Sequence, residues 1–246
     1  MTQTVSIEAL KQKIVDGLAV LTGEGCMDGS GHLSVRIPGT ETFLINPRYA
    51  GALADPEDIC IVDVKECKRL AGEGPIPSET HIHAAVYRHR PEVTSVVHCH
   101  PRHTILVGAL ESGFVPCTRE GRAFAEGVPV FPVSRNIDTP ALGERMVHSL
   151  GDFPALFLRG HGIVATGPSI EGTCVSTISL ENACRDQLLL MSFTTPRPLE
   201  DLDAGRIADR MENPYRAWPF FLYKHHVQTR EQIKANLKPL PEGERY

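Results

Sequence analysis

The chain has 246 residues, 41% of them hydrophobic and 22% charged, and its formal net charge is −5 at pH 7. These values are typical of a globular protein with one large domain or two small ones. The acidic balance and the lack of a basic block argue against nucleic acid as a partner, and no apolar run is long enough to cross a membrane. The seven cysteines are scattered, and residues 1–9 show no signal-peptide pattern, so we expect a cytoplasmic protein without a disulfide framework.

Helical and extended periodicities alternate along the chain as far as a proline-rich stretch near residue 196. In chain order, apolar spacing and turn residues predict a helix over 6–21, strands over 32–37, 42–46 and 59–64, a helix over 79–89 with Ser78 as N-cap, a strand over 93–98, a helix over 104–110, a strand over 129–133, a helix over 141–150, strands over 155–158 and 163–165, and a helix over 170–192. Helices and strands intermix without strict βαβ alternation, which favours a mixed sheet layered with helices.

The most informative segment is Val96 to Pro101, where a buried apolar strand ends in a His-x-His pair and a proline. Residues i and i+2 of a strand point to the same side, so His98 and His100 can direct both imidazoles at one point. The proline cannot donate to a strand ladder and is expected to end the strand. A third histidine, His161, stands between two glycines further along the chain. Three converging imidazoles would hold a divalent metal ion; the alternative is a set of ordinary histidines at the edge of the core.

A carboxylate precedes the histidine strand. Glu79 begins the predicted helix, and His83 lies one helical turn after it. Helical spacing puts the two side chains on one face, so the pattern places a carboxylate close to the predicted metal. The alternative is a first-turn carboxylate that only faces the helix dipole.

Polar residues also mark the first two strands. His32, Ser34 and Arg36 alternate along the first strand and therefore share one of its faces. Such a row can hold an anionic ligand, or it is a solvated polar face. Arg48 follows the next strand after an Asn-Pro pair, where its guanidinium offers a fork for a carboxylate, or it is a surface arginine.

Two other histidine pairs are less suited to a shared metal. His81 and His83 lie two residues apart on the predicted helix, where their side chains diverge by about 200°. His225 and His226 are adjacent in a polar context, and we expect them at the surface or in contact with a neighbouring subunit.

Taken together, these motifs resemble the class II aldolase/adducin family. The match covers about residues 6–195 in the family's order, and its motifs are 31–36, 77–79, His83, 97–100 and 158–162 with Gly167. The resemblance implies an α/β protein, a single-domain α/β/α sandwich around a central mixed, mostly antiparallel sheet. Residues 1–195 would form this catalytic domain, and residues 196–246 would be a C-terminal extension that packs on the same domain or on a neighbouring subunit.

The resemblance also implies a metal site and an assembly. His98, His100 and His161 would bind one divalent metal ion per subunit, and Glu79 would be a fourth ligand or the catalytic acid/base. Three imidazoles do not choose among Zn²⁺, Mn²⁺, Fe²⁺ and Co²⁺. The family forms homo-oligomers with active sites at subunit interfaces, so we expect a tetramer or an octamer.

The departures from the family's sugar-phosphate aldolases concern the phosphate cradle. His32 replaces an asparagine, a loop that ends in Arg48 replaces a loop of small residues, and only Ser78 remains of a serine pair. A dismantled phosphate site and a new arginine favour a carboxylate substrate. The pattern resembles the family's decarboxylases of hydroxylated aromatic or pyridine dicarboxylates. In that branch His32, Ser34, Arg36, Arg48 and Ser78 would bind the small aromatic carboxylate.

The resulting hypothesis is a metal-dependent carbon–carbon lyase, a carboxy-lyase that acts on a hydroxylated aromatic dicarboxylate such as 3,4-dihydroxyphthalate. A divalent ion would stabilise the enolate-like charge that the departing CO2 leaves behind. Two alternatives stay open. One is a metal-dependent aldolase or epimerase for a small hydroxy-carbonyl or sugar-phosphate compound, which needs the same charge stabilisation. The other is a non-catalytic scaffold, as in the adducin branch, which has no need of a metal.

Overall fold

A computed structural model of the chain describes residues 6–48, 50–200 and 217–236. Its elements, in chain order, are α1 (Ile7–Gly23), β1 (His32–Arg36), β2 (Thr42–Ile45), the 3-10 turns η1 (Gly51–Leu53) and η2 (Pro56–Asp58), β3 (Cys60–Asp63), β4 (Arg69–Ala71), α2 (Thr80–His89), β5 (Ser95–Cys99), α3 (Arg102–Ala109), η3 (Arg119–Phe124), β6 (Val130–Phe131), α4 (Pro140–Leu150), β7 (Ala155–Leu158), β8 (Gly162–Gly167), α5 (Ile170–Met191), α7 (Ala217–Lys224) and α8 (Arg230–Asn236). None of these helices combines the length and the apolar character that crossing a membrane requires.

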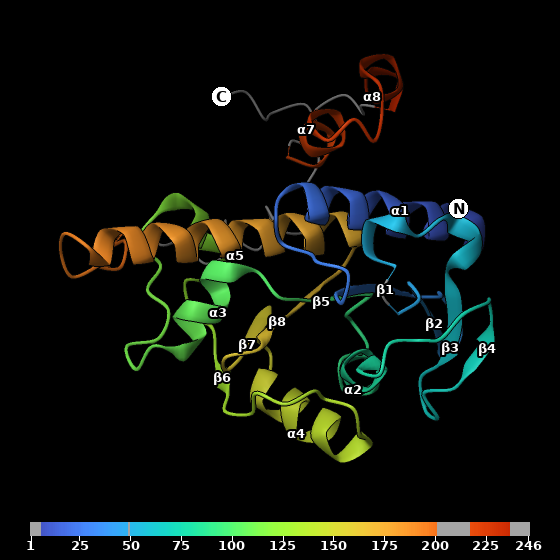
Figure 1. Cartoon of the computed structure of the whole chain (residues 1–246), viewed down its shortest axis with the longest axis horizontal. Coiled ribbons are helices and arrows are strands. Elements are labelled where there is room, and N and C mark those ends of the chain that lie inside the picture. The colour runs from blue at the N-terminus through green and yellow to red at the C-terminus, as the bar shows by residue number, and fades with distance from the viewer. Residues whose placement is uncertain (1–5, 49, 201–216, 237–246) are drawn as a thin grey trace.

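The strands form one eight-stranded sheet in the order β4-β3-β2-β1-β5-β8-β7-β6. The β6–β7 pair is parallel, and the other neighbouring pairs are antiparallel. Helices α1, α3 and α5 cover one face of the sheet, and α2 and α4 cover the other (Figure 1). The predicted α/β/α sandwich around a mixed, mostly antiparallel sheet is therefore confirmed.

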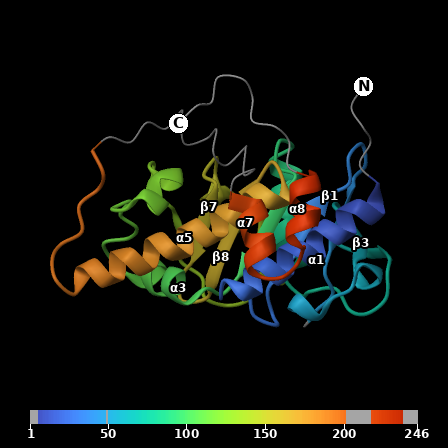
Figure 2. The same cartoon turned by 90° about the horizontal axis from the view of Figure 1, so that it is seen from above.

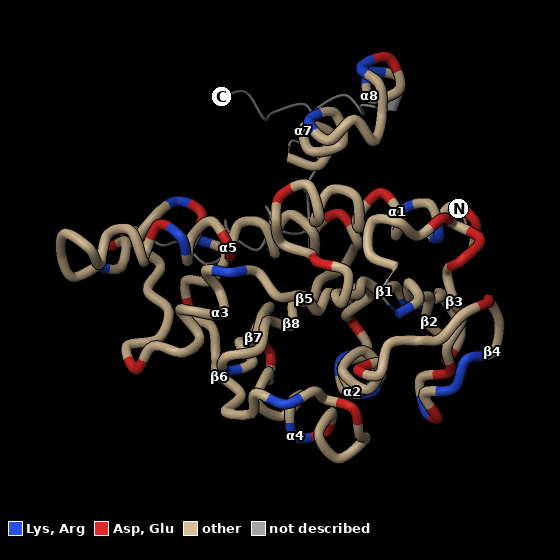
Figure 3. Tube along the Cα trace, viewed as in Figure 1, with Lys and Arg blue, Asp and Glu red and all other residues tan. Residues whose placement is uncertain are grey.

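The inner strands are apolar on both faces, as a sheet between two helical layers requires. In β5, Val97 and Cys99 pack in the core cluster under α1 and α5, whereas Val96 packs in the cluster next to α2 and α4. In β7, Phe157 packs in the first of these clusters and Leu156 in the second. Strands β5, β7 and β8 contain no Lys, Arg, Asp or Glu (Figure 3). Charged side chains beside these three strands therefore come from neighbouring elements.

Helices α7 and α8 were not predicted from the sequence. Both lie outside the layer that α1 and α5 form (Figures 1 and 2). Leu222 of α7 is buried against this layer, and Trp218 and Phe221 pack beside it. The described part of the C-terminal extension thus packs on its own chain, while the domain boundary at residue 195 stays a prediction.

The end of α7 is fastened to the end of α1. The imidazole of His225 lies so close to Gly23 that a Cβ on Gly23 would be 2.2 Å from its Nδ1. His225 Nε2 and Lys224 Nζ both reach Glu24 Oε1 at 2.6 Å. His225 is therefore half-buried in an intramolecular contact, although the sequence indicated the surface or a neighbouring subunit.

Two other local features differ from the predictions. Strand β4 lies at the edge of the sheet with all three residues exposed, so it carries none of the apolar alternation by which a strand is recognised. Helix α2 has Glu79 rather than Ser78 as its N-cap.

Candidate metal centre

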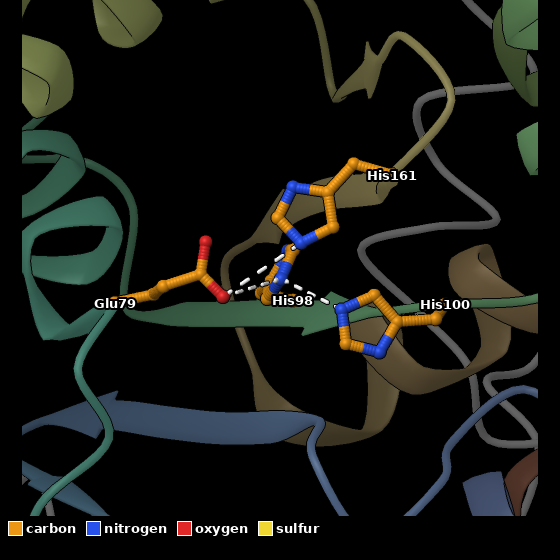
Figure 4. Close-up of side chains that lie close together, drawn as sticks. All are labelled: Glu79, His98, His100 and His161. Atoms are coloured by element: carbon orange, nitrogen blue, oxygen red, sulfur yellow. Dashed lines mark hydrogen bonds and ion pairs between the residues drawn. The ribbon is translucent and has the colours of Figure 1, made fainter. Parts of the chain in front are cut away.

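Four side chains converge at one end of the central strands (Figure 4). They are Glu79 at the N-terminus of α2, His98 in β5, His100 just after β5, and His161 in the turn between β7 and β8. One potential ligand atom from each lies within 4.8 Å of the others. The structure therefore brings together the four residues that the sequence analysis assigned to the metal and its carboxylate.

The end of β5 places the first two histidines. The strand stops at Cys99, and Pro101 is the N-cap of α3. His100 lies between these two residues, two positions after His98 and therefore on the same side of the strand. Its Nε2 comes within 3.1 Å of the Nε2 of His98.

Glycines place the third histidine. Gly160 has φ 66°, a left-handed conformation that glycine adopts without steric cost. Gly162 lies so close to β5 that an added Cβ would be 2.4 Å from the Cys99 carbonyl oxygen. Both positions require glycine for different reasons, and together they bring His161 over the end of β5.

Two of the distances between the four ligand atoms are close to those around a single divalent ion. Glu79 Oε2 is 3.4 Å from His98 Nε2 and 3.8 Å from His161 Nε2. Ligands about 2.0–2.2 Å from a tetrahedral zinc lie about 3.3–3.6 Å from one another. Three imidazoles and one carboxylate also form a donor set that zinc and its first-row neighbours accept.

Outer hydrogen bonds orient two of the imidazoles. His98 Nδ1 donates to the carbonyl oxygen of Ile163 at 2.8 Å. His100 Nδ1 lies 3.2 Å from a carboxylate oxygen of Asp28, and that oxygen also accepts from the N–H of Ser30 at 2.8 Å. Each contact occupies Nδ1 and leaves Nε2 directed at the centre, as in metal sites whose histidines are fixed from behind.

Glu79 does not use its carboxylate to cap α2, although it occupies the N-cap position. Its Oε1 instead accepts from the backbone N–H of Ile137 at 2.8 Å, which fixes the other oxygen toward the histidines. Burial acts to raise the pKa of Glu79, but the hydrogen bond and charge of His98 and the Ile137 N–H outweigh it and lower the pKa to about 2. Glu79 is therefore ionised at neutral pH.

Two histidines of the centre, His100 and His161, have lowered pKa values. Burial, followed by the neighbouring His98, lowers the pKa of His161 to about 4 and also lowers the pKa of His100. A neutral imidazole keeps the lone pair that a metal ion needs.

The centre opens into a pocket of about 180 Å³. Three of the predicted substrate-binding residues, His32, Arg48 and Ser78, line this pocket. Ser30 and Asn136 line it as well, and the sequence analysis missed both. Ser30 lies in the glycine-rich loop before β1, and the glycines of this loop could have pointed to it. Asn136 follows β6 in a segment without any periodic pattern.

Ser34 and Arg36 lie elsewhere. They do share a face of β1 with His32, but α2 covers that face. Ser34 is fully buried and shares hydrogen bonds with His83 and Tyr87. Arg36 donates to the backbone carbonyls of Tyr87 and Arg90 at the end of α2, where helix carbonyls lack partners of their own. Neither side chain is among the residues that line the pocket.

A chain of buried hydrogen bonds runs from the pocket into α2. His32 Nδ1 is 2.6 Å from His83 Nε2, His83 Nδ1 is 2.6 Å from Ser34 Oγ, and Ser34 Oγ is 2.7 Å from the Tyr87 hydroxyl. All four side chains are at most 2% exposed. Burial, followed by His98, lowers the pKa of His83 to about 3. Burial, followed by the neighbouring histidines, lowers the pKa of His32 well below its usual range, so both rings are neutral.

Residues 12–188 match the class II aldolase and adducin N-terminal domain, which is most of the chain. The chain belongs to the class II aldolase and adducin family. The family resemblance that the motifs predicted is therefore confirmed.

The relatives of this class II aldolase/adducin protein include two 3,4-dihydroxyphthalate decarboxylases. That of Arthrobacter keyseri is 31% identical over 220 residues, which cover 81% of this chain and 86% of the relative. That of Terrabacter sp. (strain DBF63) is 32% identical over 213 residues, which cover 80% of this chain and 88% of the relative. Among solved structures, L-fuculose 1-phosphate aldolase from Glaciozyma antarctica PI12 superposes with a TM-score of 0.77 at 24% identity, covering 93% of this chain and 94% of that one. At this identity the likeness shows the fold alone.

Proposed function

We propose that this protein is a metal-dependent carbon–carbon lyase that decarboxylates a hydroxylated aromatic dicarboxylate such as 3,4-dihydroxyphthalate. The observation that carries the proposal is the cluster of Glu79, His98, His100 and His161, which opens into a pocket that Arg48 also lines. The relatives named 3,4-dihydroxyphthalate decarboxylase support the substrate class.

His98, His100 and His161 would hold the ion, with Glu79 as the fourth ligand in the absence of substrate. The ion when bound supplies a Lewis acid for the electron pair that CO2 leaves on the ring. Zn²⁺, Mn²⁺, Fe²⁺ and Co²⁺ all suit this donor set.

The protein's own groups position the substrate and carry the proton. Arg48 would pair with one carboxylate through its planar fork, and His32 and Ser78 would hydrogen-bond the ring substituents. Glu79 is ionised before the reaction, so it would first accept the proton of a phenolic hydroxyl. After CO2 departs, Glu79 would return this proton to the ring carbon, which makes it both base and acid in one cycle.

Turnover assays with metal-loaded protein test the proposal. The substrates are hydroxylated phthalates, pyridine dicarboxylates and sugar phosphates, and the readout is CO2 release or carbonyl product. We expect turnover of a hydroxylated phthalate that a chelator abolishes. Turnover confined to sugar phosphates would instead establish an aldolase or epimerase. Purified protein that binds no stoichiometric metal and turns over none of these substrates would point to a scaffold.

We also propose a homo-oligomer, a tetramer or an octamer, as the family resemblance implies. Light scattering at micromolar concentration measures the mass of the particle directly. A monomer of 27.0 kDa would contradict this part of the proposal without affecting the chemistry assigned to the pocket. The cytoplasmic location likewise stays a prediction.

A further inference from the structure

His32 belongs both to the pocket and to the buried chain of hydrogen bonds. It lines the pocket, and the centroid of its ring lies 4.9 Å from that of His98. Its Nδ1 is taken by His83, so Nε2 is the nitrogen left for a ligand. Whether this Nε2 carries a proton decides whether the pocket offers a hydrogen-bond donor or an acceptor at that point.

The far end of the chain sets the direction of its hydrogen bonds. The Tyr87 hydroxyl lies 3.4 Å from the backbone oxygen of Thr94, and a carbonyl oxygen can only accept. Once Tyr87 donates to this oxygen, Ser34 must donate to Tyr87. Ser34 has one proton, so it accepts from the Nδ1–H of His83. A neutral imidazole has one N–H, so His83 Nε2 accepts from the Nδ1–H of His32, and the Nε2 of His32 is left unprotonated.

Electrostatics favours the same direction. His32 lies against His98, which the proposed function makes a ligand of a divalent cation. If the Nε2 of His32 is unprotonated, its lone pair presents the negative end of the ring dipole to the cation. A protonated Nε2 would present the positive end.

We propose that His83, Ser34 and Tyr87 are positioning residues that hold the unprotonated Nε2 of His32 toward the pocket, where it accepts a hydrogen bond from a second hydroxyl of the substrate. This inference rests on the proposed function for the class of substrate. It makes the vicinal hydroxyl a recognition element. A ring with two neighbouring hydroxyls, as in 3,4-dihydroxyphthalate, should be preferred about tenfold in kcat/KM over 3-hydroxyphthalate, which lacks the second one.

Nitrogen-15 NMR of the Zn²⁺-loaded full chain, labelled at histidine, tests the direction of the chain without any turnover. We expect a protonated Nδ1 and an unprotonated Nε2 for His32, assigned by their loss in His32→Asn. A protonated Nε2 on His32 would overturn the proposal.

Tyr87→Phe provides the kinetic test. This change removes only the terminal oxygen, so the remaining acceptor for the Ser34 hydroxyl is His83 Nδ1, and the whole chain reverses. We expect the NMR pattern of His32 to invert, and kcat/KM for 3,4-dihydroxyphthalate to fall about tenfold more than kcat/KM for 3-hydroxyphthalate, mainly through KM. The matched control is Ser95→Ala. Ser95 is equally buried on β5 and donates to the backbone oxygen of Ser34 at 3.1 Å, outside the chain, so both substrates should be affected alike.

Equal losses on both substrates in Tyr87→Phe, with the His32 pattern unchanged, would show a merely structural role and refute the proposal. If Tyr87→Phe does not fold, Ser34→Ala interrupts the same chain at its middle and is judged by the same substrate ratio. If the wild-type protein turns over neither phthalate, the proposed function fails, and the NMR result alone decides the direction of the chain.

Discussion

Glu79 and Glu24 are both carboxylates approached by histidine, and they differ in what balances their charge. Glu24 Oε1 is reached by the ammonium of Lys224 and by His225, each at 2.6 Å, where α7 meets α1. Glu79 faces His98 at 3.4 Å with two further imidazoles nearby, and no lysine or arginine is among its ion-pair partners in the described ranges. The ammonium of Lys224 completes the first cluster, whereas the described partners of Glu79 in the second are imidazoles and the Ile137 N–H.

Similar residues can therefore serve either to join two helices or to bind a metal ion. The carboxylate of Glu24, with its lysine partner, joins two helices. A buried carboxylate with several converging lone pairs and an open pocket lacks a cation, so the cluster is suited to a metal ion. The following variants test this division.

The largest effect is expected from His98→Ala combined with His100→Ala. Removing two imidazoles should abolish stoichiometric metal binding and lower turnover by about 10³-fold or more, because the Lewis acid contributes several kcal/mol to the transition state. Elemental analysis and turnover assays measure both effects. His225→Ala is the control, since it removes an imidazole from the Glu24 cluster and should keep metal and activity. A double variant that retained a full equivalent of metal would refute the assignment of ligands.

Glu79→Gln should lower kcat by about 10²-fold, the usual scale for a positioned acid or base. The amide keeps the shape and the contact with the Ile137 N–H, so the free energy of unfolding should change by less than about 1 kcal/mol. The matched control Glu24→Gln should show the reverse, with activity kept and stability lost. A near-normal kcat in Glu79→Gln would show that Glu79 is not the catalytic acid/base.

Asp28→Asn should weaken metal binding by about 10–100-fold, because Asp28 fixes His100 from behind. Competition with a chromophoric chelator measures the affinity. Asp58→Asn serves as the control, since the Asp58 carboxylate accepts from the Asp55 backbone N–H in the η2 turn and is not part of the metal centre. Equal affinities in the two variants would mean that Asp28 does not orient its histidine.

The smallest effect concerns the pH dependence of the Glu24 junction. Burial acts to raise the pKa of Glu24, but its bonds to Lys224 and His225 outweigh burial and lower the pKa below its usual value. A lowered carboxyl pKa stabilises the fold at pH values above the unfolded pKa of about 4.3, and this contribution is lost as pH falls through the folded pKa. Urea unfolding should show Glu24→Gln less stable than wild type by about 1 kcal/mol at pH 7. The difference should shrink between about pH 5 and pH 3, and a constant difference would argue against a charged junction.

Local sequence patterns determined much of this protein. The two-residue period of β5 and the proline after it directed His98 and His100 to one side, and the glycines around His161 marked a tight turn against a strand. Helical spacing predicted all five helices up to residue 192, with differences of one or two residues at most ends. These features depend on backbone geometry within a few residues, so local sequence patterns predict them.

Tertiary packing decided the rest. The period of β1 showed that His32, Ser34 and Arg36 share a face but not that α2 covers this face, so Arg36 became a helix cap and Ser34 a buried link. Asn136 reaches the pocket from a segment without periodicity, and α7 owes the burial of Leu222 to its packing on α1 and α5. A pattern along the chain gives the direction of a side chain relative to its own strand or helix. Which other element meets that side chain depends on contacts between residues far apart in sequence, and those are fixed only when the layers pack.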